Sequence, residues 1–132
     1  MKPLETTTAQ GSWGEVRIPT LAEMLRIKAW LIVRRNATRD YLDFAALAER
    51  LGPQGNWEAL CVMDELYPQP NGESVLRQLA RQLAEPKPYD LSERGLTEYR
   101  IARPPWDRWD YVCGICANIA TLLLGQIGRD RR

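Results

Sequence analysis

The chain has 132 residues, a formal net charge of +1 and no histidine. Its 45% hydrophobic and 27% charged residues are typical of one globular domain that buries its own core. The near-neutral charge gives no global attraction to nucleic acid, and the absence of imidazole excludes Ser-His-Asp and Cys-His catalysis and His-ligated zinc.

The expected compartment follows from the cysteines and the apolar runs. Three cysteines, an odd number, without a signal peptide predict a reducing, cytoplasmic setting. The longest aliphatic run, Ile119 to Leu124, is too short to cross a bilayer, so no membrane contact is expected.

The N-terminus predicts an arm that precedes the helices. Residues 1–17 are polar and without period, and we interpret them as a flexible arm with room for a short strand. The segment 15–19 fits an extended stretch that Pro19 ends. A helical domain over 18–128 and a basic tail over 129–132 complete the predicted organisation.

The first predicted helix covers Thr20 to Arg35. Thr20 with Glu23 three residues later forms a capping-box pattern, the most secure helix start in the chain. Its apolar stripe at helical spacing is interrupted by Lys28 and Arg35. The stripe consists of Leu21, Met24, Leu25, Leu31 and Ile32.

Four more helices are predicted along the rest of the chain. Apolar periodicity and Gly/Pro breaks place them at Ala37–Leu51, Trp57–Tyr67, Glu73–Ala84 and about Trp106–Gln126, with Gly52-Pro53 stopping the first of these. The expected fold is therefore all-α, a single-domain bundle of about five helices.

Charged residues on core-facing stripes are the most informative feature. Lys28 interrupts the stripe of the first helix, and Asp40 lies one turn before Phe44 on the next. A charge in a core is costly unless it is paired or used. The pattern predicts a buried Lys28–Asp40 pair, either a structural tie or half of an active site, with Arg35, Arg39 and Asp43 nearby.

The segment from Ile18 to Ala29, followed by Arg35 and then the run Arg39 to Asp43, resembles the helical half of AbiEii-type nucleotidyltransferases, the toxins of some toxin–antitoxin and phage-defence systems. The resemblance implies catalytic roles for Lys28, Asp40 and Asp43 and phosphate binding by Arg35 and Arg39. The family's Asp-x-Asp metal pair is absent before Lys28, so the resemblance implies an incomplete enzyme, inactive alone.

The leading hypothesis is a helical domain that works with a separately encoded catalytic domain. Mg²⁺ and a nucleoside triphosphate are expected only when such a partner completes the site, and RNA only through that complex; the chain itself is expected to hold no metal or cofactor. The alternative is a non-catalytic interaction module, antitoxin-like or a remnant, with a structural Lys28–Asp40 pair. Both hypotheses expect a protein partner or a homodimer.

Two further motifs each have two possible interpretations. Cys113 and Cys116 form a CxxC that suits redox or metal chemistry, but both fall on the apolar stripe of a helix, where small core residues are also typical. Trp106, Trp109 and Tyr111 suit stacking on a nucleobase or anchoring of the core.

Overall fold

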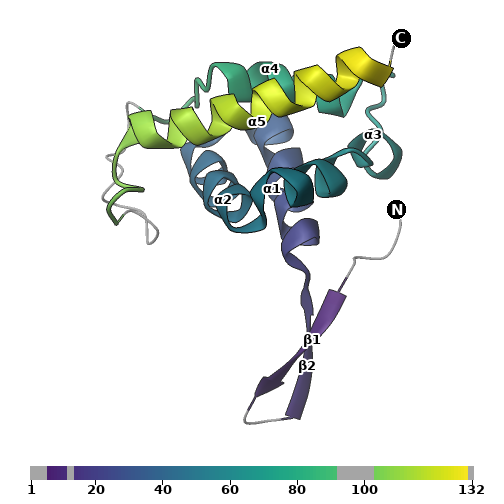
Figure 1. The fold of residues 1–132 in the computed structure, drawn as a ribbon, viewed down its shortest axis with the longest axis vertical. Helices are drawn as coiled ribbons and strands as arrows, with labels where there is room; N and C mark the ends of the chain where they lie inside the picture. The colour runs from purple at the N-terminus through teal and green to yellow at the C-terminus, as the bar shows by residue number, and fades with distance from the viewer. Residues whose placement is uncertain (1–5, 12–13, 92–102, 131–132) are drawn as a thin grey trace.

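The N-terminal segment forms a β-hairpin. The computed structural model describes residues 6–11, 14–91 and 103–130. Strands β1 (Thr6–Gly11) and β2 (Gly14–Pro19) pair antiparallel, with Thr6 opposite Pro19. The hairpin extends away from the helices (Figure 1). The predicted extended stretch at 15–19 therefore lies in β2, while its pairing with β1 was not predicted.

Helix α1 (Leu21–Arg35) begins and ends on side chains suited to each end. The hydroxyl of Thr20 accepts a hydrogen bond from the backbone N–H of Glu23 at 3.1 Å, as an N-cap does. Asn36 follows the last turn with φ 52°, a left-handed conformation that asparagine tolerates better than most residues.

Helix α2 (Thr38–Leu60) is bent at Gly52, whose φ of 77° and ψ of 169° suit glycine almost exclusively. The predicted stop is therefore a kink. The helix resumes immediately because the fixed φ of Pro53 suits a first helical position. The predicted helix at Trp57–Tyr67 is consequently divided between the end of α2 and the short α3 (Met63–Leu66).

Helices α4 (Val75–Ala84) and α5 (Trp109–Asp130) complete the domain. Helix α1 packs on α2 and α4, and α5 packs on both α4 and α2 (Figure 1). Helix α5 starts at Trp109 rather than Trp106 and continues past the predicted end at Gln126 to Asp130. Residues 131–132 of the predicted basic tail lie outside the described residues. The prediction of an all-α bundle of about five helices is confirmed.

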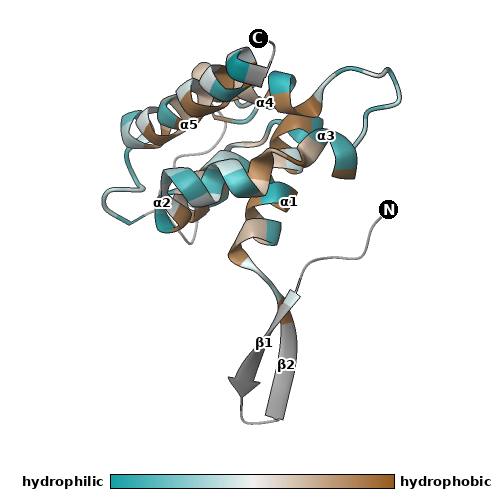
Figure 2. Ribbon diagram, turned by 45° about the vertical axis from the view of Figure 1, so that its right-hand side comes forward, coloured by the Kyte–Doolittle hydropathy of each residue, from teal (hydrophilic) through white to brown (hydrophobic). Residues whose placement is uncertain are grey.

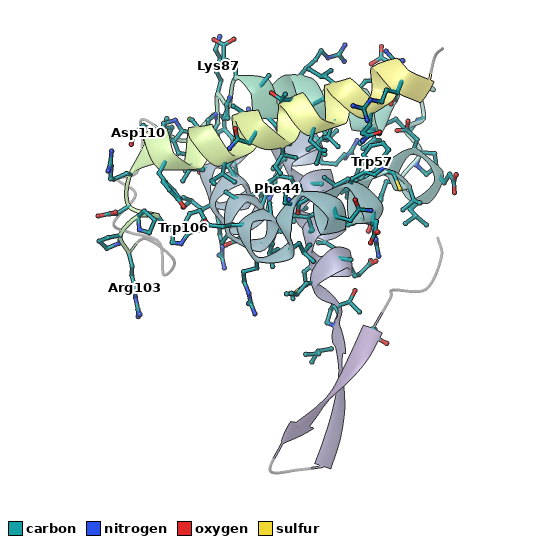
Figure 3. The ribbon with its side chains drawn as sticks, in the orientation of Figure 1. Phe44, Trp57, Lys87, Arg103, Trp106 and Asp110 are labelled. Carbon is teal, nitrogen blue, oxygen red and sulfur yellow. The ribbon has the colours of Figure 1, made fainter. Side chains whose placement is uncertain are left out.

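The core lies where these helices meet. Hydrophobic residues form stripes along α1 and α5 (Figure 2), and Phe44 lies between the helices near the centre (Figure 3). The largest fully buried side chains come from all five helices; they are Leu25, Ile32, Tyr41, Leu42, Phe44, Leu60, Met63, Val75, Leu79, Leu83, Val112 and Leu123. Burial of apolar area on this scale is the main stabilising term of the fold.

Candidate functional site

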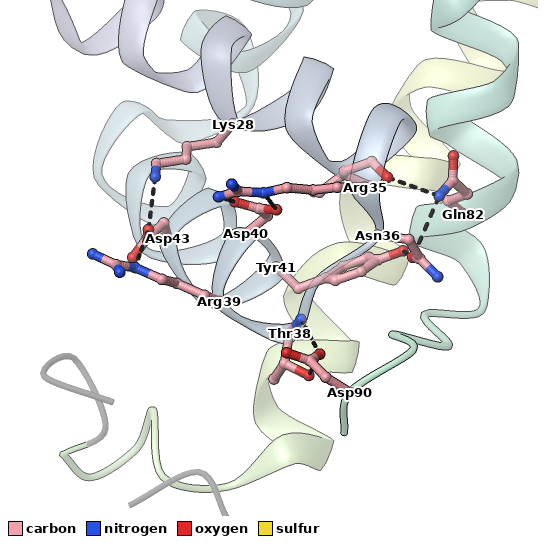
Figure 4. A network of polar contacts seen from close by, with 11 residues as sticks. Lys28, Arg35, Asn36, Thr38, Arg39, Asp40, Tyr41, Asp43, Gln82 and Asp90 are labelled. Carbon is pink, nitrogen blue, oxygen red and sulfur yellow. Dashed lines mark hydrogen bonds and ion pairs between the residues drawn. The ribbon is translucent and has the colours of Figure 1, made fainter. Parts of the chain in front are cut away.

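Lys28 lies at the edge of the α1–α2 interface. Its Nζ is 2.9 Å from Oδ2 of Asp43, and both side chains are about one quarter exposed (Figure 4). The predicted buried Lys28–Asp40 pair is therefore wrong in both its partner and its burial.

Asp40 is paired with Arg35 instead. Arg35 donates from Nε to Oδ2 at 2.7 Å and from Nη2 to Oδ1 at 2.8 Å, which is bidentate geometry (Figure 4). The Asp40 side chain is completely buried, and that of Arg35 is 53% exposed. The hydrogen bonds to Asp40 raise the pKa of Arg35, so the guanidinium stays charged.

The short link between α1 and α2 explains this exchange of partners. Two residues separate the helices, so Arg35 at the end of α1 lies beside the first turn of α2, where Asp40 is. Lys28 lies about two turns further from the link, and its long side chain reaches Asp43 on the next turn of α2.

Asp43 is shared by two cations. Besides Lys28, the Nε of Arg39 lies 3.8 Å from its Oδ2, the i,i+4 neighbour on the same helix. All five predicted site residues thus form one cluster, in which each carboxylate has a cationic partner. Their predicted catalytic and phosphate-binding roles depended on the AbiEii resemblance.

A long-range network at the start of α2 was missed by the sequence analysis. Oδ1 of Asp90 accepts hydrogen bonds from the backbone N–H of Thr38 at 2.8 Å and from its hydroxyl at 2.7 Å (Figure 4). Asn36 accepts a hydrogen bond from the phenol of Tyr41 and donates one to the backbone oxygen of Lys87 at 2.8 Å. Partners fifty residues apart leave no local signal.

A buried ion pair inside α1 was also missed. Glu23 and Arg26 lie 2.9 Å apart with side chains 6% exposed, and Arg26 also donates to the backbone oxygen of Ala59 at 3.2 Å. The i,i+3 spacing is the available sequence signal. Because each charge has partners, this pair is a tie between α1 and the end of α2.

A cavity of about 480 Å³ opens between α1 and α2, next to the Lys28–Asp43 pair. Its walls are mainly apolar, and charged groups lie at its rim. The lining residues are Met24, Ile27, Lys28, Asp43, Ala46, Leu47 and Arg50.

The CxxC motif and the aromatic residues that precede it lie mainly in the packed interior of the bundle. Cys116 is buried in the core, and Cys113 is half-buried. Trp109 contacts the buried Tyr41 edge to face, with ring centroids 6.1 Å apart, as a core anchor does. No group of three His, Cys, Asp or Glu residues within the described ranges could hold a metal ion.

Comparison with known proteins shows that the sequence is similar to a segment of proteins named for transport. It is 34% identical over 127 residues to the heme uptake protein MmpL11 of Mycobacterium tuberculosis, and equally so to the mycolic acid-containing lipids exporter MmpL11 of Mycolicibacterium smegmatis. A probable transport protein MmpL11 of Mycobacterium leprae is 36% identical over 129 residues. Each match covers 94% of this chain but 12–13% of the relative. No family model and no solved structure matches.

These relatives correct the predicted family and function. Similarity along nearly the whole chain to MmpL11 contradicts the resemblance to AbiEii-type nucleotidyltransferases, which rested on about a quarter of the residues. The assignments to a toxin–antitoxin or phage-defence setting, to a split nucleotidyltransferase and to an antitoxin-like module are therefore wrong. Short motifs of Lys, Arg and Asp misled because ion pairs between adjacent helices produce the same spacing.

The predictions of a cytoplasmic location and of no membrane contact are corrected as well. The relatives are named for transport, uptake and export. Within the described residues, Trp109–Arg129 is also long and apolar enough to cross a membrane by length and composition. The aliphatic run considered first was too narrow a measure, because Trp, Cys, Gly and Ala extend the apolar stretch on either side of it. In the fold, one face of this helix is buried against α2 and α4.

Proposed function

We propose that this chain serves as a helical domain of a membrane transport system of the MmpL11 kind. The observation that carries the proposal is the match along 94% of the chain at 34% identity. The chain spans about 13% of the length of those relatives, so the matched segment has the size of one domain within a much larger transporter.

The polar cluster supports a structural role for the domain. Arg35 pairs with Asp40, and Lys28 and Arg39 pair with Asp43, so that neither carboxylate is left without a cationic partner. A bundle with its own core and with paired interhelical charges suits a rigid element that positions other parts of a transporter.

The buried face of α5 supports a position of the bundle beside the membrane. Val112, Cys116 and Leu123 are 0% exposed because they pack into the bundle. Moving α5 into lipid would expose the apolar surfaces of α2 and α4 that it covers. We therefore place the folded bundle beside the membrane, with α5 retained in its core.

A chimera tests the proposal. This chain would replace the matching 127 residues of the M. smegmatis exporter in a strain lacking that exporter, and surface lipids containing mycolic acid would be measured by thin-layer chromatography. We expect export to be restored. A matched chimera carrying Leu79→Asp, which places a charge in the core, should be inactive.

A chimera that reaches the membrane without restoring export would contradict the proposal. If the chimera reaches wild-type levels in the membrane fraction and lipid export stays at the level of the deletion strain, the chain is no functional counterpart of the segment it resembles. An unrelated helical bundle of equal length, inserted at the same position, shows whether any folded domain suffices.

A further inference from the structure

The cavity between α1 and α2 combines apolar walls with a charged rim. Met24, Ile27, Ala46 and Leu47 line it, and its volume of about 480 Å³ falls within the roughly 300–1,000 Å³ typical of small-molecule sites. Met24 was expected on the core-facing stripe of the first helix. In the fold it lies, with Leu47, at an opening lined only by residues of α1 and α2.

The charge at the rim is positive. Two cations, Lys28 and Arg50, and one carboxylate, Asp43, are among the lining residues, and Asp43 pairs with Lys28 and with Arg39 outside the lining. Asp40 adds no free negative charge because Arg35 holds both of its oxygens. Glu49, the acidic neighbour of Arg50 in the chain, does not line the cavity, and its carboxylate accepts a hydrogen bond from the phenol of Tyr111 at 3.0 Å. A surplus of one positive charge thus remains among the lining residues, and Arg50 carries it.

Arg50 is the cation that can reach a ligand. It lines the cavity, its residue is exposed, and it has no ion-pair partner among the described residues. An arginine fork recognises a carboxylate bidentately, and an apolar wall beside it suits a hydrocarbon chain.

We propose that this cavity binds a single-chain amphiphile with an anionic head, of the fatty-acid class. The hydrocarbon chain lies against Met24, Ile27 and Leu47, and the carboxylate lies at Arg50. The inference stands on the cavity and its charges and does not require the transport role proposed above, so each can fail separately.

Calorimetric titration of the 132-residue protein with sodium laurate, below its micelle concentration, tests the proposal. We expect saturable binding at one site. Shortening the chain to sodium octanoate should weaken it steeply, up to about fourfold for each methylene that contacts the wall. Methyl laurate, which has the same chain without the charge, should bind at least about tenfold more weakly.

Variants assign the binding to this cavity. Arg50→Glu should weaken laurate binding by at least about tenfold, and Arg81→Glu, a matched reversal on the exposed face of α4, should leave it unchanged. Ala46→Phe fills the cavity and should abolish binding while the thermal transition is retained.

Four results would overturn the proposal. The first three are no saturable binding of laurate, equal binding of laurate and methyl laurate, and an equal effect of Arg50→Glu and Arg81→Glu. Binding to vesicles containing phosphatidylglycerol without binding of monomeric laurate would also overturn it, because the basic rim would then recognise a lipid surface. If Ala46→Phe fails to fold, the comparison of Arg50→Glu with Arg81→Glu still shows whether laurate binds in this cavity.

Discussion

Asp90 caps a helix that begins fifty-two residues earlier in the chain, by accepting hydrogen bonds from the backbone N–H and the hydroxyl of Thr38. Ala37, at the N-cap position of α2, has no side chain that could do this. The loop after α4 therefore supplies what the local sequence lacks, and a carboxylate at a helix N-terminus is also favoured by the helix dipole.

We expect Asp90→Ala to lower the free energy of unfolding by about 1–2 kcal/mol, because Thr38 then loses both hydrogen bonds. Asp90→Asn keeps an acceptor oxygen and should retain most of the stability. Urea denaturation measures both variants. An Asp90→Ala variant as stable as the wild type would show that the cap contributes nothing.

The Arg35–Asp40 pair predicts a non-additive pair of substitutions. Arg35→Ala leaves a fully buried carboxylate without its cation and should destabilise the fold by about 1–3 kcal/mol. Arg35→Met combined with Asp40→Leu removes both charges and should be more stable than the single variant. A double variant no more stable than Arg35→Ala would contradict this account.

Lys28→Ala provides the matched comparison in the same cluster. Its pair with Asp43 is partly exposed, and Asp43 retains Arg39 as a partner, so we expect a loss below about 1 kcal/mol. The sequence-based pairing with a buried Asp40 required a much larger loss. Chemical denaturation of Lys28→Ala and Arg35→Ala in parallel separates the two arrangements.

Two glycines should respond to alanine in opposite directions. Gly52→Ala should destabilise the protein by about 1–3 kcal/mol because φ 77° with ψ 169° strains any residue with a Cβ. Gly114→Ala, within α5 and with open space around its added Cβ, should stabilise it by about 0.5–1 kcal/mol. Melting temperatures of both variants check the contrast, which would fail if the two shifts had the same sign.

Tyr41 predicts a loss of stability in alkali. Burial raises the pKa of its phenol from 10.0 to about 12. The folded protein therefore holds this proton more tightly than the unfolded chain, so the contribution is fully present below pH 10 and is lost as the pH rises toward 12. Tyr41→Phe should show a shallower fall in unfolding free energy over this range than the exposed control Tyr89→Phe. Identical slopes would contradict the assignment.

The cysteines report whether α5 stays packed. Cys61 is exposed and should react promptly with a polar thiol reagent, whereas the buried Cys116 should react only as the protein unfolds. Mass spectrometry after timed labelling distinguishes the sites. Rapid labelling of Cys116 in the native protein would mean that α5 leaves the bundle readily.

Local chemistry was sufficient for several elements. Thr20 followed by Glu23 located the start of α1, and Gly52-Pro53 located the break in α2, because capping and backbone preferences act within a few residues. The resumption of the helix at Pro53 was missed because the same proline that ends one helix can begin another.

The site was predicted as a group but not as pairs. Helical periodicity brought Lys28, Arg35, Arg39, Asp40 and Asp43 to one interface. Which cation meets which carboxylate depends on how far each lies from the link between α1 and α2, and on side-chain length, which sequence spacing does not give. The same spacing suggested an enzyme family because paired charges between adjacent helices resemble a catalytic motif.

The sequence by itself determined the helical class, the start of α1, the break in α2 and the apolar stripes, since these depend on interactions between residues close together in the chain. The tertiary structure decided the Asp90 cap on Thr38, the partners of Asp40 and Asp43, and the opening of the cavity beside Arg50. Those features join segments that meet only when the helices pack, and packing is governed by the total apolar area buried rather than by any local pattern.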